Sequence, residues 1–206
     1  MPKPTHAHSF VAGTDATGVP LVLLHGSDGT ESDLMGLADA VEPGAPKLGV
    51  RGTVATEGGY AFFHRFLDRR VNEADLAARA PVLAEFIKTT CDRYHFTRRP
   101  VFVGFSNGAI MAAALVLTHP GLLAGAILFR SLSPFTHGPL RGLDGTPILM
   151  IDGANDIRRS SRDGLRLAGR LRRAGAKVTH HLLPVGHSIT AEDGEIAGER
   201  LRPLTR

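Results

Sequence analysis

The stretch PVFVGFSNGAIMAAALVLT, residues 100–118, decides the fold because it joins two kinds of secondary structure at one serine. Its first six residues form a short apolar run after a proline, which is typical of a strand buried on both faces. The residues after Ser106 have the length and the small side chains of a helix that packs closely on a sheet, and Pro120 follows its end. Ser106 therefore falls on a tight strand-to-helix turn, where Gly104 and Gly108 carry no Cβ that would clash.

Further apolar runs of strand length alternate with helical patterns along the chain. They cover residues 8–13, 20–26, 46–52, 124–130, 147–153 and 177–183. This alternation predicts an α/β fold with a mainly parallel sheet, right-handed crossovers and helices on both faces. The sequence contains no repeat and no long linker. We therefore expect a single α/β domain over residues 1–206.

Three predicted helices begin with Ser or Thr followed three residues later by Asp, the pattern of a capping box. The pairs are Thr30 with Asp33, Ser160 with Asp163, and Thr190 with Asp193. Asn72 is a further predicted N-cap, of a helix over residues 72–94. Pro81 lies inside that helix, so we expect a break or a kink there.

The composition is that of an ordinary soluble globular protein. The chain is 43% hydrophobic and 21% charged, and it has a formal net charge of +4. No stretch approaches the ~20 apolar residues of a membrane span. The N-terminal residues lack the apolar core of a signal peptide, which predicts a cytoplasmic protein without membrane insertion.

The net positive charge does not predict a nucleic-acid partner. The 24 Lys and Arg residues are spread along the chain, and seven arginines are concentrated between Arg158 and Arg173. Helical spacing there leaves Leu165, Ala168 and Leu171 for a buried face, so we expect the arginines on a solvated face.

Metal and disulfide chemistry are not indicated. Cys91 is the single cysteine, and we interpret it as a buried thiol in a helix. His6 and His8 share a strand face, but no third ligand accompanies them and the motif HExxH is absent. We expect neither a metal nor a cofactor.

Ser106 with its flanking glycines matches G-x-S-x-G, the nucleophile elbow. A serine hydroxyl near neutral pH needs a base to accept its proton. His187 is the preferred base because it follows the strand over 177–183 and so lies at its carboxyl end. Other histidines are less well placed: His180 and His181 within that strand, His119 beside a helix end, and His64 in a long connection.

A carboxylate must then fix the tautomer of the base. Asp156 follows the strand over 147–153 by a few residues and is preferred, because a loop residue can reach His187. Asp152 ends that strand directly and is the alternative. The chain order Ser106, Asp156, His187 is that of the α/β-hydrolases.

Two backbone N–H groups are predicted to bind the oxyanion that forms during acyl transfer. One belongs to Asn107, directly after the nucleophile. The other belongs to Ser27, in the HGSDG turn (residues 25–29) that follows an earlier strand. The alternative for HGSDG is a polar turn that leads into the next helix.

These segments together resemble the phospholipase/carboxylesterase family of α/β-hydrolases, which is related to acyl-protein thioesterases and dienelactone hydrolases. LLHGSDGTESDL (23–34) is similar to its oxyanion segment, GFSNGA (104–109) to its elbow, DGAND (152–156) to its acid loop and GHS (186–188) to its base loop. LGVRGTVATEGGYAFFHRF (48–66) resembles a small bacterial carboxylesterase branch, except that Ala61 stands where that branch is expected to have arginine. The resemblance implies a single α/β-hydrolase domain over residues 1–206 without a large lid. It also implies a cofactor-independent serine esterase for small carboxylic esters. A homodimer is one assembly that it implies.

Two other functions stay open at this stage. An acyl thioesterase would use the same groups, and a non-catalytic ligand-binding protein could share the fold. The serine at position 106, in place of the cysteine of dienelactone hydrolases, argues against that particular activity.

The substrate-binding residues are less well determined by the sequence. Tyr60, Phe62 and Phe63 are either pocket walls or core residues. Arg51 either meets a substrate anion or forms a structural ion pair.

Overall fold

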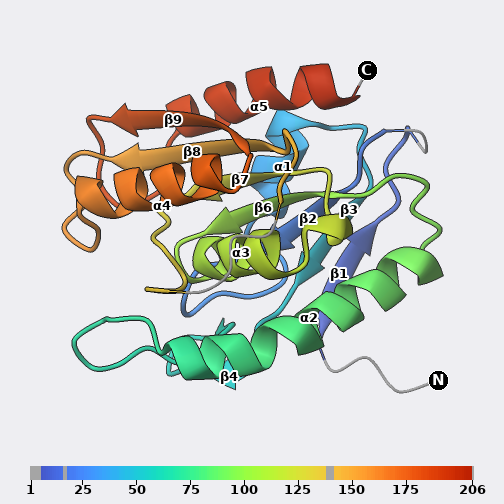
Figure 1. Cartoon of the computed structure of the whole chain (residues 1–206). Helices are drawn as coiled ribbons and strands as arrows, with labels where there is room; N and C mark the ends of the chain where they lie inside the picture. The colour runs from blue at the N-terminus through green and yellow to red at the C-terminus, as the bar shows by residue number, and fades with distance from the viewer. Residues whose placement is uncertain (1–5, 16–17, 138–141, 206) are drawn as a thin grey trace.

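A seven-stranded sheet forms the centre of the structure (Figure 1), a computed structural model that describes residues 6–15, 18–137 and 142–205. The strands lie in the order β1-β3-β2-β6-β7-β8-β9. Only β1 runs antiparallel to its neighbour, and all other neighbours are parallel. Their bounds are β1 His8–Val11, β2 Leu21–Leu24, β3 Lys47–Val50, β6 Val101–Phe105, β7 Gly125–Phe129, β8 Pro147–Gly153 and β9 Lys177–Leu183. Each coincides with a predicted run, which confirms the mainly parallel α/β architecture.

Helices cover both faces of the sheet: α2, α3 and α4 lie on one face, and α1 and α5 on the other (Figure 1). Their bounds are α1 Met35–Val41, α2 Glu73–Arg93, α3 Asn107–Thr118, α4 Ser161–Arg173 and α5 Ala191–Thr205. A short 3₁₀ turn, Pro120–Leu122, follows α3. A small antiparallel pair, β4 (Val54–Ala55) and β5 (Tyr60–Ala61), lies between β3 and α2 in the chain.

The continuous apolar strands follow from this coverage. In β2, Val22 and Leu24 belong to the core on the α2–α3–α4 side, and Leu21 and Leu23 to the core on the α1–α5 side. Because successive side chains of a strand point to opposite faces, a strand covered on both sides has no solvent-exposed face that would favour polar residues.

Three of the four predicted helix caps are present. Ser160 and Asp163 form a complete capping box at α4. The Asn72 side chain accepts a hydrogen bond from the Asp75 amide at the start of α2. Thr190 and Asp193 exchange amide-to-side-chain bonds before α5; these lie at 2.7 and 3.4 Å.

The predicted cap at Thr30 is wrong. Helix α1 begins only at Met35, and the Thr30 hydroxyl donates to the Asp33 carboxylate at 2.7 Å within the turn before it. The residues between Thr30 and Met35 form turns rather than helix. The Thr-x-x-Asp pattern at Thr30 therefore marks a polar turn and not the first residue of α1.

No break occurs at Pro81, because α2 is continuous from Glu73 to Arg93. Proline removes the hydrogen bond to the carbonyl four residues earlier, here that of Ala77. Both Ala77 and Pro81 lie on the exposed side of the helix, where water can bind that carbonyl. The buried side holds the helix in place through residues such as Leu83 and Ile87.

The prediction for the arginine-rich segment was partly wrong. Ala168 and Leu171 are buried as expected, but Leu165 is 60% exposed. Two of the arginines are buried instead of solvated, Arg159 before α4 and Arg170 within it. Helical spacing alone could not show that Leu167, two positions after Leu165, faces the sheet.

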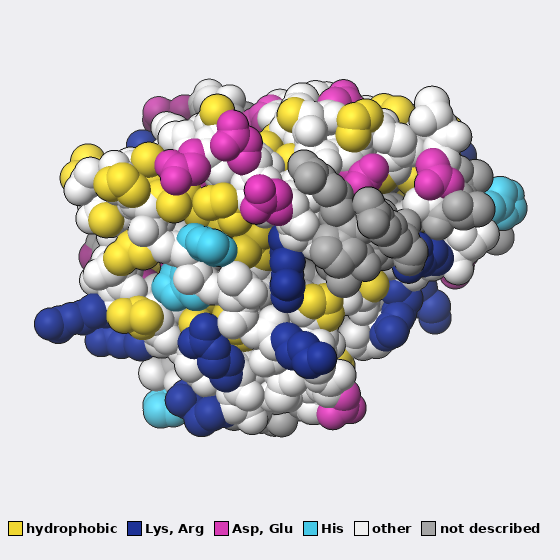
Figure 2. All heavy atoms as spheres, turned by 90° about the horizontal axis from the view of Figure 1, so that it is seen from above, with side chains coloured by type: hydrophobic (Ala, Val, Ile, Leu, Met, Phe, Trp, Pro, Cys, Tyr) yellow, Lys and Arg dark blue, Asp and Glu magenta, His cyan; other side chains and the backbone are white. Residues whose placement is uncertain are grey.

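Exposed charges are of both signs. Figure 2 shows Lys and Arg side chains mainly in the lower half of the view and acidic side chains mainly in the upper half. Among the residues that the structure describes, no helix combines the length and the apolarity that crossing a bilayer requires.

A Gly108→Ala substitution should destabilise the fold. A Cβ at Gly108 would lie 2.1 Å from the Leu24 carbonyl oxygen, so α3 would have to move away from β2. We expect a loss of at least about 1–3 kcal/mol in the free energy of unfolding, measured by urea denaturation.

Gly36→Ala is the matched control, since a Cβ at Gly36 in α1 would have no heavy atom within 4 Å. This variant should be neutral or more stable by up to about 1 kcal/mol. Equal stability of the Gly108 variant and the wild type would contradict the close approach of α3 to β2.

Candidate active site

Ser106 occupies a strained turn between β6 and α3. Its backbone has φ 50° and ψ −106°, a conformation that costs about 1–3 kcal/mol in a residue other than glycine. The Ser106 amide donates to the Phe129 carbonyl at 3.0 Å, and its carbonyl accepts from the Ile110 amide at 3.1 Å. A Cβ at Gly104 would lie 2.7 Å from the Cα of Ala109. The glycine therefore lets the turn close and presents the serine hydroxyl at the carboxyl edge of the sheet.

Three predicted side chains meet at this edge. Ser106 Oγ lies 2.9 Å from His187 Nε2, and His187 Nδ1 lies 2.7 Å from Asp156 Oδ2. This arrangement fits an imidazole that donates Nδ1–H to the carboxylate and accepts the serine proton at Nε2.

Asp156 is held from both sides. Its second oxygen, Oδ1, accepts from the amides of Arg158 at 2.7 Å and Arg159 at 3.2 Å. The alternative acid, Asp152, instead contacts His180 Nε2 at 2.8 Å. The structure thus brings Asp156, and not Asp152, to His187.

The loop that carries His187 is fixed by Arg130, which the sequence analysis missed. Arg130 directly follows β7, is fully buried, and donates to the carbonyls of Gly186 at 3.0 Å and Ser188 at 2.8 Å. Its guanidinium also forms a two-point ion pair with buried Asp193, at 2.8 and 2.7 Å. The peptide groups on both sides of His187 are therefore held by one cation. The sequence signal for this role was an arginine at the end of the apolar run over residues 124–130.

The turn with Ser27 lies beside the nucleophile. A Cβ on the preceding residue, Gly26, would lie 3.7 Å from the Cβ of Ser106. His25 holds this turn, because its Nδ1 contacts the Gly26 carbonyl at 2.6 Å and its Nε2 accepts from the Gly52 amide at 3.0 Å. Burial lowers the pKa of His25, in agreement with a neutral ring that donates at one nitrogen and accepts at the other.

Asn107 begins α3, so its backbone N–H has no acceptor within the helix. The side chain of Asn107 has a separate structural task. It accepts from the Phe62 amide at 2.7 Å and donates to the Phe63 carbonyl at 3.3 Å. Both phenylalanines are buried in the core. The structure therefore favours the core alternative for these two rings.

Arg51 and Tyr60 contact each other. The Arg51 guanidinium lies 4.2 Å from the centre of the Tyr60 ring and 3.7 Å from the Glu31 carboxylate. Tyr60 also exchanges backbone hydrogen bonds with Gly29, which ties the segment to the turn that holds Ser27. Arg51 thus has structural partners, as the ion-pair alternative expected.

Arg159 was assigned to a solvated helix face but lies at the nucleophile. It is 7% exposed, and its Nη2 donates to Ser106 Oγ at 3.1 Å. The sequence did not distinguish Arg159 from the other six arginines of this segment. Only the structure shows that Arg159 lies in the loop before α4 and not on the helix.

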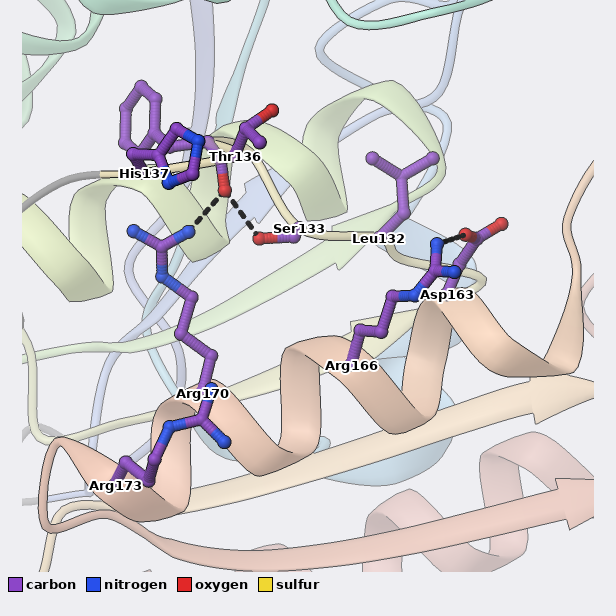
Figure 3. Close-up of a pocket in the computed structure, with 9 residues that line it drawn as sticks. Leu132, Ser133, Thr136, His137, Asp163, Arg166, Arg170 and Arg173 are labelled. Carbon is purple, nitrogen blue, oxygen red and sulfur yellow. Dashed lines mark hydrogen bonds and ion pairs between the residues drawn. The ribbon is translucent and has the colours of Figure 1, made fainter.

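A pocket of about 640 Å³ lies between α4 and the segment after β7 (Figure 3). Figure 3 shows Arg166 directed toward Asp163, and Arg170 directed toward the segment with Ser133. None of the three residues Ser106, Asp156 and His187 lines this pocket. In the parts of the chain that the structure describes, no group of three His, Cys, Asp or Glu side chains could hold a metal ion.

Removing one member of the buried ion pair should destabilise the protein strongly. Arg130→Met leaves the Asp193 carboxylate buried without its partner, for which we expect a loss of about 3–5 kcal/mol in urea denaturation. The double variant Arg130→Met with Asp193→Leu should recover most of that stability, because no charge is then buried alone.

Fluorophosphonate labelling of Ser106 separates positioning from stability. The double variant should react more slowly than the wild type, because the carbonyls beside His187 have lost their donor. A double variant with wild-type stability and wild-type labelling would show that Arg130 does not position His187.

Comparisons with known proteins identify the family of this chain. Residues 59–202 match the family described as phospholipase/carboxylesterase. MhqD of Bacillus subtilis (strain 168) is 35% identical over 193 residues, which cover 93% of this chain and 96% of that protein.

Two crystal structures extend the similarity to the whole fold. The Bacillus cereus carboxylesterase superposes with a TM-score of 0.94 at 35% identity, over 98% of this chain and 95% of that one. The carboxylesterase from Mesorhizobium loti gives 0.91 at 29% identity, over 98% and 97%. The chain therefore belongs to the phospholipase/carboxylesterase family and is a carboxylesterase with the α/β-hydrolase fold.

Proposed function

We propose that this carboxylesterase uses Ser106 as nucleophile, His187 as general base and acid, and Asp156 to orient His187. The observation that carries the proposal is the continuous contact from Ser106 Oγ to His187 Nε2 at 2.9 Å and from His187 Nδ1 to Asp156 at 2.7 Å. Nucleophile, base and orienting acid in hydrogen-bond reach define a serine hydrolase by geometry.

The reaction follows from these contacts. His187 takes the proton as Ser106 Oγ attacks the ester carbonyl, and the carbonyl oxygen becomes an oxyanion. When the intermediate collapses, the bond to the alcohol breaks and His187 gives the proton to the leaving alkoxide. Water then attacks the acyl-enzyme with His187 again as base, and it releases the carboxylic acid and Ser106.

The backbone N–H groups of Asn107 and Ser27 are the proposed oxyanion donors. Asn107 stands at the first position of α3, where the helix dipole also favours negative charge. Ser27 follows Gly26, which packs beside Ser106. Each such donor contributes about 2.7–4 kcal/mol to transition-state stabilisation in serine hydrolases.

We propose small carboxylic esters as the substrates. Ser106 is only 7% exposed, which supports substrates with small groups beside the reacting carbonyl. Among the described helices, none lies outside the two layers that cover the sheet as a lid would. Two similar structures are named as carboxylesterases, which supports an oxygen ester over a thioester.

Ser106→Ala should abolish turnover. Removing the nucleophile is expected to lower kcat by about 10⁴–10⁶, because the remaining groups cannot form an acyl-enzyme. The measurement compares wild type and variant on 4-nitrophenyl esters from acetyl to palmitoyl, with a thioester of matched chain length. We expect activity to peak at short acyl chains.

The same experiment includes a covalent probe. A fluorophosphonate should label the wild type at Ser106 and leave the Ser106→Ala variant unlabelled. Labelling at another residue, or equal turnover by both proteins, would refute Ser106 as the nucleophile.

The activity should be retained to mildly acidic pH. Burial lowers the pKa of His187, and the charges of Arg159 and Arg158 lower it further, against the raising effect of Asp156. Only the neutral imidazole can accept the Ser106 proton, so kcat/KM falls as the pH drops through this pKa. The acidic half-point of kcat/KM should therefore lie below 6.5.

Arg158→Gln removes one of these cations and should move the half-point upward. The Arg158 side chain is exposed, so the shift is expected to be a fraction of a pH unit. A wild-type half-point at or above 6.5 would contradict the assignment of His187 as a base in this environment.

A further inference from the structure

The guanidinium of Arg159 is buried at the nucleophile without an ion-pair partner. Its three bonded nitrogens donate to Ser106 Oγ at 3.1 Å, to the Arg130 carbonyl at 3.1 Å and to the Arg158 carbonyl at 3.0 Å. All three acceptors are neutral. Within residues 6–15, 18–137 and 142–205, no carboxylate lies within 4 Å of this cation.

The nearby acids are engaged elsewhere. Asp156 is bonded to His187 and to two backbone amides. Asp163 caps α4 and faces Arg166. Asp152 contacts His180 through Oδ2, and its Oδ1 is buried without a hydrogen-bond partner among the described residues. None of these carboxylates forms an ion pair with Arg159.

A second cation, Arg65, reinforces the positive charge. Burial first, and then the charge of Arg65, lower the pKa of Arg159 to about 10, so Arg159 still carries its proton at neutral pH. The Nε of Arg65 is itself buried and has no hydrogen-bond partner among the described residues. The charge of Arg65 thus acts on Arg159, and its Nε–H is still available to an acceptor.

The serine chemistry does not require this arrangement. Ser106 needs one acceptor for its proton, which His187 supplies, and the oxyanion donors are backbone amides. A buried charge that only meets a hydroxyl and two carbonyls is costly, whereas a carboxylate is a stronger acceptor for a guanidinium than any of these.

We infer that Arg159 forms an anion subsite beside the nucleophile, and that the preferred substrates are esters with a carboxylate close to the scissile carbonyl. This inference rests on the proposed role of Ser106. On binding, the carboxylate replaces Ser106 Oγ as the acceptor for Nη2, which also frees the hydroxyl oxygen for attack.

Distances limit where the carboxylate lies. The carbonyl carbon must approach Oγ to about 3–3.5 Å before attack. Since Nη2 is 3.1 Å from Oγ, the guanidinium and the carbonyl carbon are at most about 6–7 Å apart. A charge-assisted hydrogen bond takes about 2.8 Å of this span, so the carboxylate is two or three bonds from the carbonyl carbon.

Two pairs of esters with matched shapes test the inference and locate the carboxylate. Ethyl hydrogen malonate against ethyl 3-methylbutanoate places the charge on the acyl side. Acetoxyacetate against isobutyl acetate places it on the alcohol side. Initial rates in a pH-stat give kcat/KM for each ester, and the ratio of the anionic to the neutral member is the quantity compared.

We expect the wild type to prefer the anionic member of at least one pair. Arg159→Met should lower that ratio by about 10–100-fold, the effect of losing a hydrogen bond to a charged group. Arg159→Lys should retain part of the preference because it keeps the charge. The pair that responds shows which side of the ester carries the carboxylate.

Arg158→Met is the matched control. It removes the same charge from the preceding residue, whose side chain is exposed. It should change both members of each pair by the same factor. Thermal unfolding of all variants, and the Arg159→Lys protein in particular, identifies any loss that comes from misfolding.

Two outcomes would overturn the inference. One is a wild type that hydrolyses the neutral esters with no anionic preference. The other is an Arg159→Met protein whose four rates fall by one common factor, which would assign Arg159 a structural role only. Failure of the proposed function looks different, since a wild type that hydrolyses none of the esters would also lack fluorophosphonate labelling at Ser106.

Discussion

The buried ion pair between Arg130 and Asp193 is the interaction on which the geometry of the site depends. It joins the end of β7 to the first turn of α5, and the same guanidinium holds the two carbonyls that flank His187. The Arg130 carbonyl in turn accepts from Arg159, which reaches Ser106. A buried pair is weak evidence for stability, since apolar residues of similar size often serve as well. Its value here is that it orders loops from several strands around one point.

The site combines this rigid support with an excess of positive charge. The strained turn at Ser106 fixes where the hydroxyl emerges, and glycines on either side make that turn sterically accessible. Around it, burial lowers the pKa of His187, Asp156 raises it, and Arg159 and Arg158 lower it further. Arg159, which helps to keep the base neutral, would also attract an anionic substrate. Base strength and substrate preference are therefore coupled through shared charges.

Much of the fold could be predicted from the sequence, because apolar runs and glycine positions report local constraints. Every predicted strand is present, and Ser106, Asp156 and His187 meet as their positions at strand ends suggested. The wrong predictions concern surroundings rather than local pattern. Thr30 matches the pattern of a cap, but helix α1 begins only at Met35. The break predicted at Pro81 is absent, and Pro81 lies on the exposed side of α2. Leu165 fits the helical spacing of the buried face but is exposed, because Leu167 and Ala168 pack against the sheet instead.

The sequence by itself determined the order of strands and helices along the chain, the elbow and the three groups of the candidate triad. These depend on residue type and spacing, which are local and survive in a one-dimensional pattern. Tertiary structure decided which charges are buried and what they touch. Arginine is usually a surface residue. Arg130 and Arg159 are buried because loops that are distant in the chain fold over the carboxyl edge of the sheet. Burial and partner choice depend on contacts between segments far apart in the chain, and a pattern along the chain carries no measure of those distances.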